Sequence, residues 1–394
     1  MGAPGRRRSV AVALIVLSQW LGTSLWFSPS GAAEDLSRWL DLDAGGFGWL
    51  LAATQLGFIA GTLASTVTGA ADRFPPERIF ALCSVAGAAL NCFWTLGSPG
   101  FGVAWIARFG VGVALAGIYP MGMKMIVQRV GGGSGSALGW LVAMLTLGTA
   151  MPHILRSLGA SLPWQAVIWG ASILATVGAV VVLLIQERVP GASRVLPKNS
   201  GSVRGLFALK DFRASCGGYL GHMWELYAFW SVVPLLCLRL LPQHVDPVSV
   251  ATLSAVVIAA GSVGCVAGGA LSRRVGSEVV AAFALAGSGL LCLLYPLIPA
   301  SAVVLKIGIL VLWGALVIAD SPQFSAMSAR YVPAQQVGTA LTAQNSAGFL
   351  LTVVSIVVLQ SALASWGEPA LWLLVPGPVL GLVAMRRLLR SGPR

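Results

Sequence analysis

Long apolar runs of about 20 residues follow one another along this chain, separated by short polar breaks. A helix rises about 1.5 Å per residue, so a run of this length crosses the hydrocarbon core of a bilayer, which is about 30 Å thick. Charged residues make up 10% of the 394 residues, against about 25% in soluble domains. A chain so poor in charge cannot cover a surface that faces water. The sequence therefore predicts an all-α membrane protein with twelve transmembrane helices, at 9–28, 46–67, 78–97, 101–127, 137–158, 164–186, 214–241, 249–271, 278–298, 301–327, 337–364 and 369–389.

The distribution of basic residues orients these spans. With both termini in the cytoplasm, all but six of the 25 Lys and Arg residues lie on the inner side or in the terminal segments that face it. The exceptions are Arg108, Lys124 and Lys306 within spans, and Arg38, Arg156 and Arg239 on the outer side. This bias accounts for the net charge of +12 without a nucleic-acid partner. We expect a multi-pass protein of the cytoplasmic (inner) membrane.

A polar motif occurs twice, about half the chain apart. Gly269 to Gly276 reads GALSRRVG, and Thr68 to Arg73 reads TGAADR, 201 residues earlier. Trp26-Phe27-Ser28 is likewise followed 203 residues later by Phe229-Trp230-Ser231. Such a repeat predicts two similar halves in parallel orientation. We expect six-helix bundles at 1–186 and 214–394, joined by a basic, proline-containing cytoplasmic linker at 187–213.

The layout and the motif together resemble the major facilitator superfamily over essentially the full length. The family carries a loop motif of the form G-x-L-x-D-R-x-G-R-R between its second and third spans, and implies a fold of two six-helix bundles. The resemblance implies a conformational role for the matching residues, with Asp72 holding the outward-facing state. The alternative is a turn with solvated charges. The matching residues are Asp72, Arg73, Arg78, Gly269, Arg274 and Gly276.

Further sequence segments resemble one branch of the family. Those at 117–124, 221–227 and 319–324 resemble a bacterial branch described as nitrate/nitrite- or cyanate-transporter-like, although the nitrate transporters' own signature is absent. Arg108 begins an R-x-x-x-G motif that the family associates with proton coupling. A glycine pattern typical of exporters is only half present, at Gly139 and Gly148, which argues against an antiporter.

Charged residues inside spans are costly, so each is a functional candidate. Glu225 lies about 16 Å into the seventh span, near the midplane, and His222 lies one turn before it on the same face. A carboxyl group at that depth is a candidate proton carrier. The alternatives are a neutral Glu and a neutral His that are hydrogen-bonded within the core.

Lys124 and Asp320 occupy matching parts of the fourth and tenth spans, which line the cavity in this family. We hypothesise that they pair across the halves or separately contact solute and proton. Lys124 could instead extend to the headgroups, as we expect for Lys306. Arg108 could receive an anionic group or bond structurally to span carbonyls.

Polar and aromatic side chains complete the predicted pathway, and packing in the core is the alternative for each aromatic one. These residues are Gln19, Trp26, Tyr119, Tyr227, Gln323, Gln344 and Asn345. Met121, Met123 and Met125 with His222 suggest copper, since soft ligands select Cu(I), but the spacing of the methionines does not suit one site.

We therefore expect a secondary active transporter, proton-coupled, that moves a small organic or anionic solute as a monomer in the lipid bilayer. A proton-driven drug or metabolite exporter is the alternative, and a copper or metal-complex transporter a minor one. No enzyme activity and no cofactor or metal is expected, because the chain shows no phosphate loop, metal cluster or nucleophile triad and contains three histidines.

Overall fold

A computed structural model describes residues 3–68, 70–97, 100–130, 134–159, 161–185, 203–241, 247–333 and 336–390. Every regular element in these ranges is a helix, which confirms the predicted all-α membrane fold. Within the described residues, ten helices are long and apolar enough to span a bilayer, and a bent pair makes up to eleven. The predicted span at 78–97 corresponds to α5, Pro76–Phe93, which is not among them, so the count of twelve stays a prediction.

The chain forms two compact units. Unit 1 consists of Met1–Asp41 and Ala53–Leu196, and unit 2 of Leu42–Ala52 and Pro197–Arg394. Helix α3, Ala44–Thr68, therefore contributes its first residues to unit 2 and the rest to unit 1.

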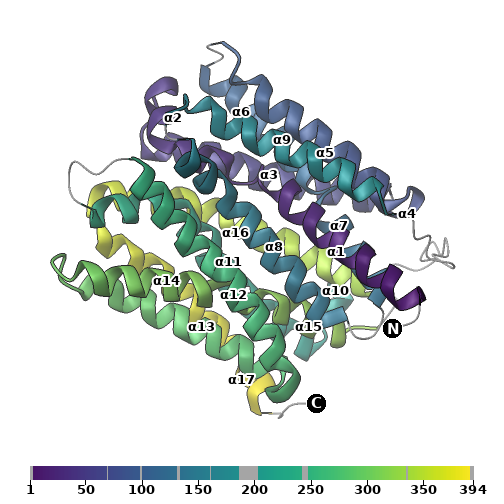
Figure 1. Cartoon of the computed structure of the whole chain (residues 1–394). Helices are drawn as coiled ribbons and strands as arrows, with labels where there is room; N and C mark the ends of the chain where they lie inside the picture. The colour runs from purple at the N-terminus through teal and green to yellow at the C-terminus, as the bar shows by residue number, and fades with distance from the viewer. Residues whose placement is uncertain are drawn as a thin grey trace. The chain divides into compact units, whose positions relative to one another are not determined.

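Unit 1 is built around a broken first span. Helix α1 ends at Thr23, and the chain turns before η1 and α2 continue it at a bend of 51°. Helix α9 lies alongside α1 and α5, and α5 also lies along α6 (Figure 1). The helices of this unit, besides α3, are α1 (Ala3–Thr23), η1 (Ser28–Ala32), α2 (Ala33–Leu40), α4 (Ala70–Arg73), α5 (Pro76–Phe93), α6 (Gly100–Leu115), α7 (Tyr119–Val130), α8 (Ser134–Leu158) and α9 (Gln165–Leu183).

Unit 2 is built around a continuous first span. Helix α11 runs without a break for 31 residues and packs mainly against α17 and α16, while α12 packs along α14 (Figure 1). The helices of this unit are α10 (Val203–Leu206), α11 (Lys210–Leu240), α12 (Pro247–Val275), α13 (Ser277–Leu294), η3 (Tyr295–Leu297), α14 (Val303–Ala319), α15 (Ser321–Arg330), α16 (Val337–Trp366), η5 (Glu368–Leu374) and α17 (Pro376–Arg390).

The fourth and tenth predicted spans are interrupted at matching places. Helix α6 gives way to α7 just before Pro120, and α14 gives way to α15 at Asp320, just before Pro322. Proline is accepted in the first turn of a helix because its missing N–H has no partner there in any case. Polar groups at such breaks are where ion and solute sites form in many transport proteins.

Close helix crossings fix the positions of these broken spans. In unit 1, a side chain at Gly57 or Gly112 would collide with the backbone of the facing helix, α6 or α3. In unit 2, Gly264 and Gly314 allow the same close approach of α12 and α14. Small residues let helices approach closely within a membrane, where packing supplies much of the association energy. The two units therefore share a close helix crossing as well as similar sequence motifs.

Candidate functional site

The centre of α11 carries two ionisable side chains of unit 2. Glu225 is the sixteenth of 31 residues in this helix, and His222 precedes it by three residues. Both side chains are buried, as the sequence predicted from their place in a span. Three residues correspond to about 4.5 Å along the helix axis, so the two groups belong to one site.

Glu225 accepts a hydrogen bond at each carboxylate oxygen. The indole N–H of Trp313 on α14 donates to Oε1 at 2.6 Å, and the Ser288 hydroxyl on α13 donates to Oε2 at 2.9 Å. Trp313 also stacks on Phe229, at 4.3 Å between ring centroids, which fixes the indole plane. Among the described residues, no Lys or Arg pairs with Glu225. A buried carboxyl group with only neutral partners can exist with or without its proton.

His222 contacts the helix break of the tenth span. Its Nδ1 lies 2.8 Å from Oδ1 of Asp320, the residue between α14 and α15, and both side chains are buried. The two atoms are close enough for an ion pair, but their angles do not meet those of a hydrogen bond. Tyr219 and Phe324 flank the imidazole at 5.9 Å. Asp320 thus has a partner inside its own unit, which the sequence did not predict.

A chain of neutral polar groups lies on the cytoplasmic side of this pair in the predicted orientation. Ser215 bonds to Ser328 at 2.9 Å, and Ser328 donates to the side-chain oxygen of Gln344. The amide nitrogen of Gln344 has no hydrogen-bond partner among the described residues. The predicted pathway residue Gln344 therefore lies in the interior of unit 2, joined to α11 through two hydroxyl groups.

Arg108 is fully buried in unit 1 and binds neutral acceptors. One terminal nitrogen, Nη2, donates to the carbonyls of Leu25 and Trp26, at 3.1 and 2.6 Å, and to the Thr54 hydroxyl at 2.9 Å. The other, Nη1, donates to Asn91 at 2.7 Å and Ser28 at 3.2 Å. The carbonyls belong to the break after α1, where the helical bonds are missing. This is the structural alternative considered from the sequence.

The predicted aromatic residues pack within their own units. Trp26 lies 5.1 Å from Phe58 between ring centroids and donates its indole N–H to Gln55 at 3.4 Å. Tyr227 lies 5.3 Å from both Trp230 and Phe349. These contacts are the core packing that stood as the alternative to a solute contact.

The remaining predicted pathway residues differ in burial. Gln19 and Gln323 are buried, and both polar atoms of the Gln19 amide lack a hydrogen-bond partner among the described residues. Lys124 and Asn345 are half-buried, and Tyr119 is buried at the start of α7. The pairing of Lys124 with Asp320 stays a prediction. No group of three or more His, Cys, Asp or Glu side chains that could hold a metal occurs in the described part of the chain.

The loop-motif residues are largely exposed. Arg73, Arg78 and Arg274 face solvent, and Asp72 belongs to α4, with its side chain outside the described residues. Gly276 has a φ of +89°, which side-chain-bearing residues rarely adopt, whereas a side chain at Gly269 would meet no atom within 4 Å. Only the second of these glycines is required by the local backbone.

The sequence interpretation missed two ion pairs, each of which uses a Glu four residues after an arginine of the motif. In unit 1, Arg129 at the end of α7 donates to Glu77 in the first turn of α5 at 2.8 Å. In unit 2, Arg330 donates to Glu278 at 3.0 Å, and both residues lie 201 positions after their counterparts. We call these pairs the unit 1 clasp and the unit 2 clasp. Their shared offset was the signal that could have revealed them.

The unit 2 clasp has a third member. The Tyr331 hydroxyl donates to Glu278 at 2.5 Å. Burial and the neighbouring Glu278 carboxyl raise the pKa of Tyr331, so the phenol keeps its proton and remains a donor at any physiological pH. Glu278 is therefore held by two donors, one charged and one neutral.

The expectation that Lys306 extends to the headgroups is wrong. Its side chain is buried, and its amine donates to Glu368 of η5 at 2.5 Å and lies 4.7 Å above the Tyr295 ring. A buried amine is stable only when it is paired, and Glu368 lies far along the chain in a segment that sequence patterns do not connect to α14.

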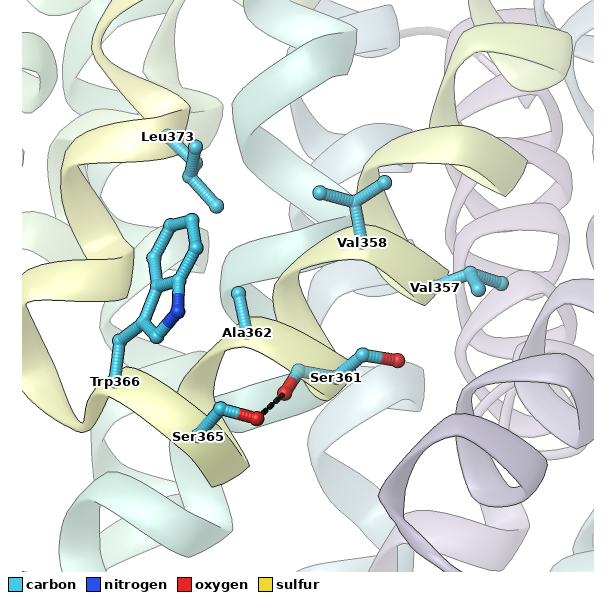
Figure 2. Close-up of a pocket in the computed structure, with 7 residues that line it drawn as sticks. All are labelled: Val357, Val358, Ser361, Ala362, Ser365, Trp366 and Leu373. Carbon is cyan, nitrogen blue, oxygen red and sulfur yellow. Dashed lines mark hydrogen bonds between the residues drawn. The ribbon is translucent and has the colours of Figure 1, made fainter.

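An apolar pocket lies apart from these polar groups. Figure 2 shows it at the end of α16, where the Trp366 ring lies near Leu373 of η5. The pocket has a volume of about 460 Å³, and its polar lining consists of two serines, Ser361 and Ser365, joined by a hydrogen bond of 3.3 Å. No charged side chain lines it, and no sequence-predicted residue lies in it. The remaining lining residues are Val357, Val358 and Ala362.

Comparisons with known proteins agree with the fold. The family profile described as Major Facilitator Superfamily matches residues 9–385. A solved structure of a bacterial homolog of the human lysosomal transporter Spinster, inward-facing and unoccupied, superposes with a TM-score of 0.66 at 15% identity, covering 100% of this chain and 96% of that one. At this identity the likeness shows the fold alone. No curated protein sequence matches this chain.

Proposed function

This chain belongs to the major facilitator superfamily, which confirms the family resemblance and makes it a transporter and not an enzyme, and we propose that it couples movement of a small organic solute to protons. The observation that carries the proposal is Glu225, a fully buried carboxyl group in the middle of α11 with two neutral donors and, within the described part of the chain, no cation partner. A permanent charge there would be costly, and binding a proton removes it.

The pair of His222 and Asp320 is proposed as the second proton-binding group. It joins the middle of α11 to the break between α14 and α15, so a change in its charge acts on both helices. Protonation of Asp320 removes the attraction to a protonated His222, and deprotonation restores it. Alternating access by the two bundles then links the charge state of unit 2 to the exposure of the solute site.

The class of solute is proposed from the chemistry of the predicted pathway, which combines aromatic rings and amides with few charges. The sequence favoured anions modestly, because Arg108 counted as an available positive charge. Its terminal nitrogens bond within unit 1, which weakens that argument. Membership of the nitrate- or cyanate-like branch, a monomeric state and cytoplasmic termini remain predictions.

The proposal is tested with purified protein in liposomes that contain a pH-sensitive dye. Organic anions, neutral metabolites, lipophilic cations and Cu(I) are first screened by thermal stabilisation at two pH values, and the stabilising compounds are then added to the liposomes. We expect solute-dependent proton movement that falls more than about tenfold in Glu225→Gln and in Asp320→Asn. Asp211→Asn is the matched control, because it removes a carboxylate whose partner, Arg387, is exposed and lies outside the site.

Solute movement without proton movement in the unmodified protein would contradict proton coupling. Stabilisation by lipophilic cations alone would favour the exporter, and stabilisation by Cu(I) alone would favour metal transport. Full proton movement in Glu225→Gln would exclude Glu225 as the carrier.

A further inference from the structure

The hydroxyl group of Ser288 has two hydrogen-bond partners within reach. Its oxygen lies 2.9 Å from Oε2 of Glu225 and 3.2 Å from the carbonyl oxygen of Leu285, three residues earlier in α13. A hydroxyl group has one proton to donate and can also accept. It can therefore donate to Glu225 or to Leu285, but to only one of them at a time. Ser288 is itself buried, so water does not compete for it.

The two choices match the two protonation states of Glu225. When the carboxyl group is ionised, Ser288 donates to Oε2 and Trp313 donates to Oε1, so both oxygens are satisfied. When Oε2 carries a proton, that O–H donates to the Ser288 oxygen, and the serine proton turns to the Leu285 carbonyl. Trp313 can only donate and keeps its bond to Oε1 in both states.

In a core without water, a carboxyl group that gains and loses a proton needs a hydrogen-bond partner from the protein in both states, and Ser288 can supply one. A buried polar group left without a partner destabilises the folded state, and a fixed donor at Oε2 would clash with a proton there. With Ser288, gain and loss of the proton require rotation about one C–O bond and no movement of a helix. The proton is transferred to and from Glu225 itself, and Ser288 keeps its own.

We propose that Ser288 is a positioning residue that lets Glu225 bind and release a proton without an unsatisfied polar atom in either state. The inference rests on the proposed function, because it assumes that Glu225 changes its protonation. Among the described residues, Cys292 on α13 and Asp320 at the end of α14 are titratable groups that interact electrostatically with Glu225, and His222 lies about one turn away on α11.

Difference infrared spectroscopy of the whole protein in lipid, between acidic and basic buffer, tests both claims without a solute. The carbonyl stretch of a protonated carboxyl group identifies Glu225 as the band that disappears in Glu225→Gln. We expect that band to move to higher frequency in Ser288→Ala, where the acid proton loses its acceptor. Ser288→Thr keeps a hydroxyl that can bond back to the helix, and should restore the band.

Two further measurements separate this role from a structural one. Ser24→Ala in unit 1 is the matched control, since the Ser24 hydroxyl also lies near a carbonyl three residues earlier, at 2.6 Å, but its second acceptor is the Ala171 carbonyl at 2.9 Å and not a carboxyl group. It should leave the band unchanged. In liposomes, Ser288→Ala should slow proton movement about tenfold, as expected for one lost hydrogen bond, and Ser288→Thr should recover it.

The outcomes distinguish the two claims. If no band disappears in Glu225→Gln, the carboxyl group does not change its protonation, and the proposed function fails together with this inference. If the band disappears in Glu225→Gln but is unmoved in Ser288→Ala, Glu225 remains the carrier and the role of Ser288 is wrong. If Ser288→Ala is too unstable to measure, an unmoved band in Ser288→Thr with normal proton movement supports the inference, and loss of proton movement in that variant overturns it.

Discussion

The first membrane spans of the two units, which begin with α1 and α11, contain similar sequences and differ in structure. Trp26-Phe27-Ser28 lies in the break that follows α1, whereas Phe229-Trp230-Ser231, 203 residues later, lies inside the continuous α11. At the break in unit 1, the Leu25 carbonyl accepts a long bond of 3.5 Å from the Ser28 N–H, and Arg108 donates to the carbonyls of both Leu25 and Trp26. The residue 201 positions after Arg108 is Ile309, which cannot donate. Inside a membrane, a helix can break only where another group replaces its hydrogen bonds.

The buried charges of the two units therefore have different roles. The Arg108 guanidinium sits at the C-terminal end of α1, where the helix dipole favours a cation, and its bonds join the break to α3 and α5. Glu225 in unit 2 accepts hydrogen bonds from two neutral side chains, Trp313 and Ser288. The difference teaches that a fixed charge can stabilise a bundle, whereas a charge with replaceable partners is suited to proton exchange.

Removing the guanidinium should have the largest effect on stability. Arg108→Met removes a donor from two carbonyls, an amide oxygen and two hydroxyls, and we expect a loss of about 3–5 kcal/mol. Glu225→Gln should cost less than about 1 kcal/mol, because the new amide can donate to Ser288 while Trp313 still donates to its oxygen. Thermal unfolding in detergent measures both. Equal destabilisation by the two substitutions would contradict the different roles assigned to Arg108 and Glu225.

The clasps test what the two units share. Arg129 is almost fully buried, whereas Arg330 is 37% exposed and Glu278 retains Tyr331 as a second donor. Arg129→Gln should therefore cost about 1.5–3 kcal/mol, and Arg330→Gln about 1 kcal/mol or less. The measurement is the shift in unfolding midpoint, with Tyr331→Phe combined with Arg330→Gln as the control that removes both donors. A larger effect of Arg330→Gln alone would show that Tyr331 does not compensate.

Backbone geometry separates the two glycines of the second motif. Gly276→Ala forces a side chain into a positive φ and should cost about 1–2 kcal/mol. Gly269→Ala lies inside α12, with open space around it, and should be neutral or slightly stabilising. Unfolding midpoints of the two variants check this order. Destabilisation by Gly269→Ala would indicate a contact that the structure does not contain.

The segment beyond the break in unit 1 gives the smallest expected effects. Arg156 donates to Asp35 of α2 at 2.7 Å and is mostly buried, whereas Arg38 pairs with Asp35 and Glu34 on an exposed face. Arg156→Gln should cost about 1 kcal/mol and increase amide hydrogen exchange in α2, and Arg38→Gln should change little. Exchange that rises equally in both variants would show that α2 is not held by Arg156.

Much of the fold was predictable because the lengths of apolar runs reflect the bilayer directly. The all-α fold and the central, buried position of Glu225 follow from where charges interrupt those runs, whereas the family was inferred from a resemblance in layout and loop motif. Helix α11 begins four residues earlier than expected, because Lys210 and Arg213 extend the helix beyond its apolar part. The clasps were missed because Glu77 and Glu278 were not considered from the sequence, although their offset of 201 residues matches that of Arg129 and Arg330.

The sequence alone determined that this chain crosses a membrane, repeats itself and places a carboxyl group in the middle of its seventh span, since each is a property of local composition and spacing. Only the tertiary structure decided which polar groups meet: Arg108 with the broken α1, His222 with Asp320, and Glu225 with Trp313 and Ser288. The physical reason is that lipid satisfies no hydrogen bond. Every buried polar group takes its partner from another helix, and that choice depends on how helices distant in the sequence pack together.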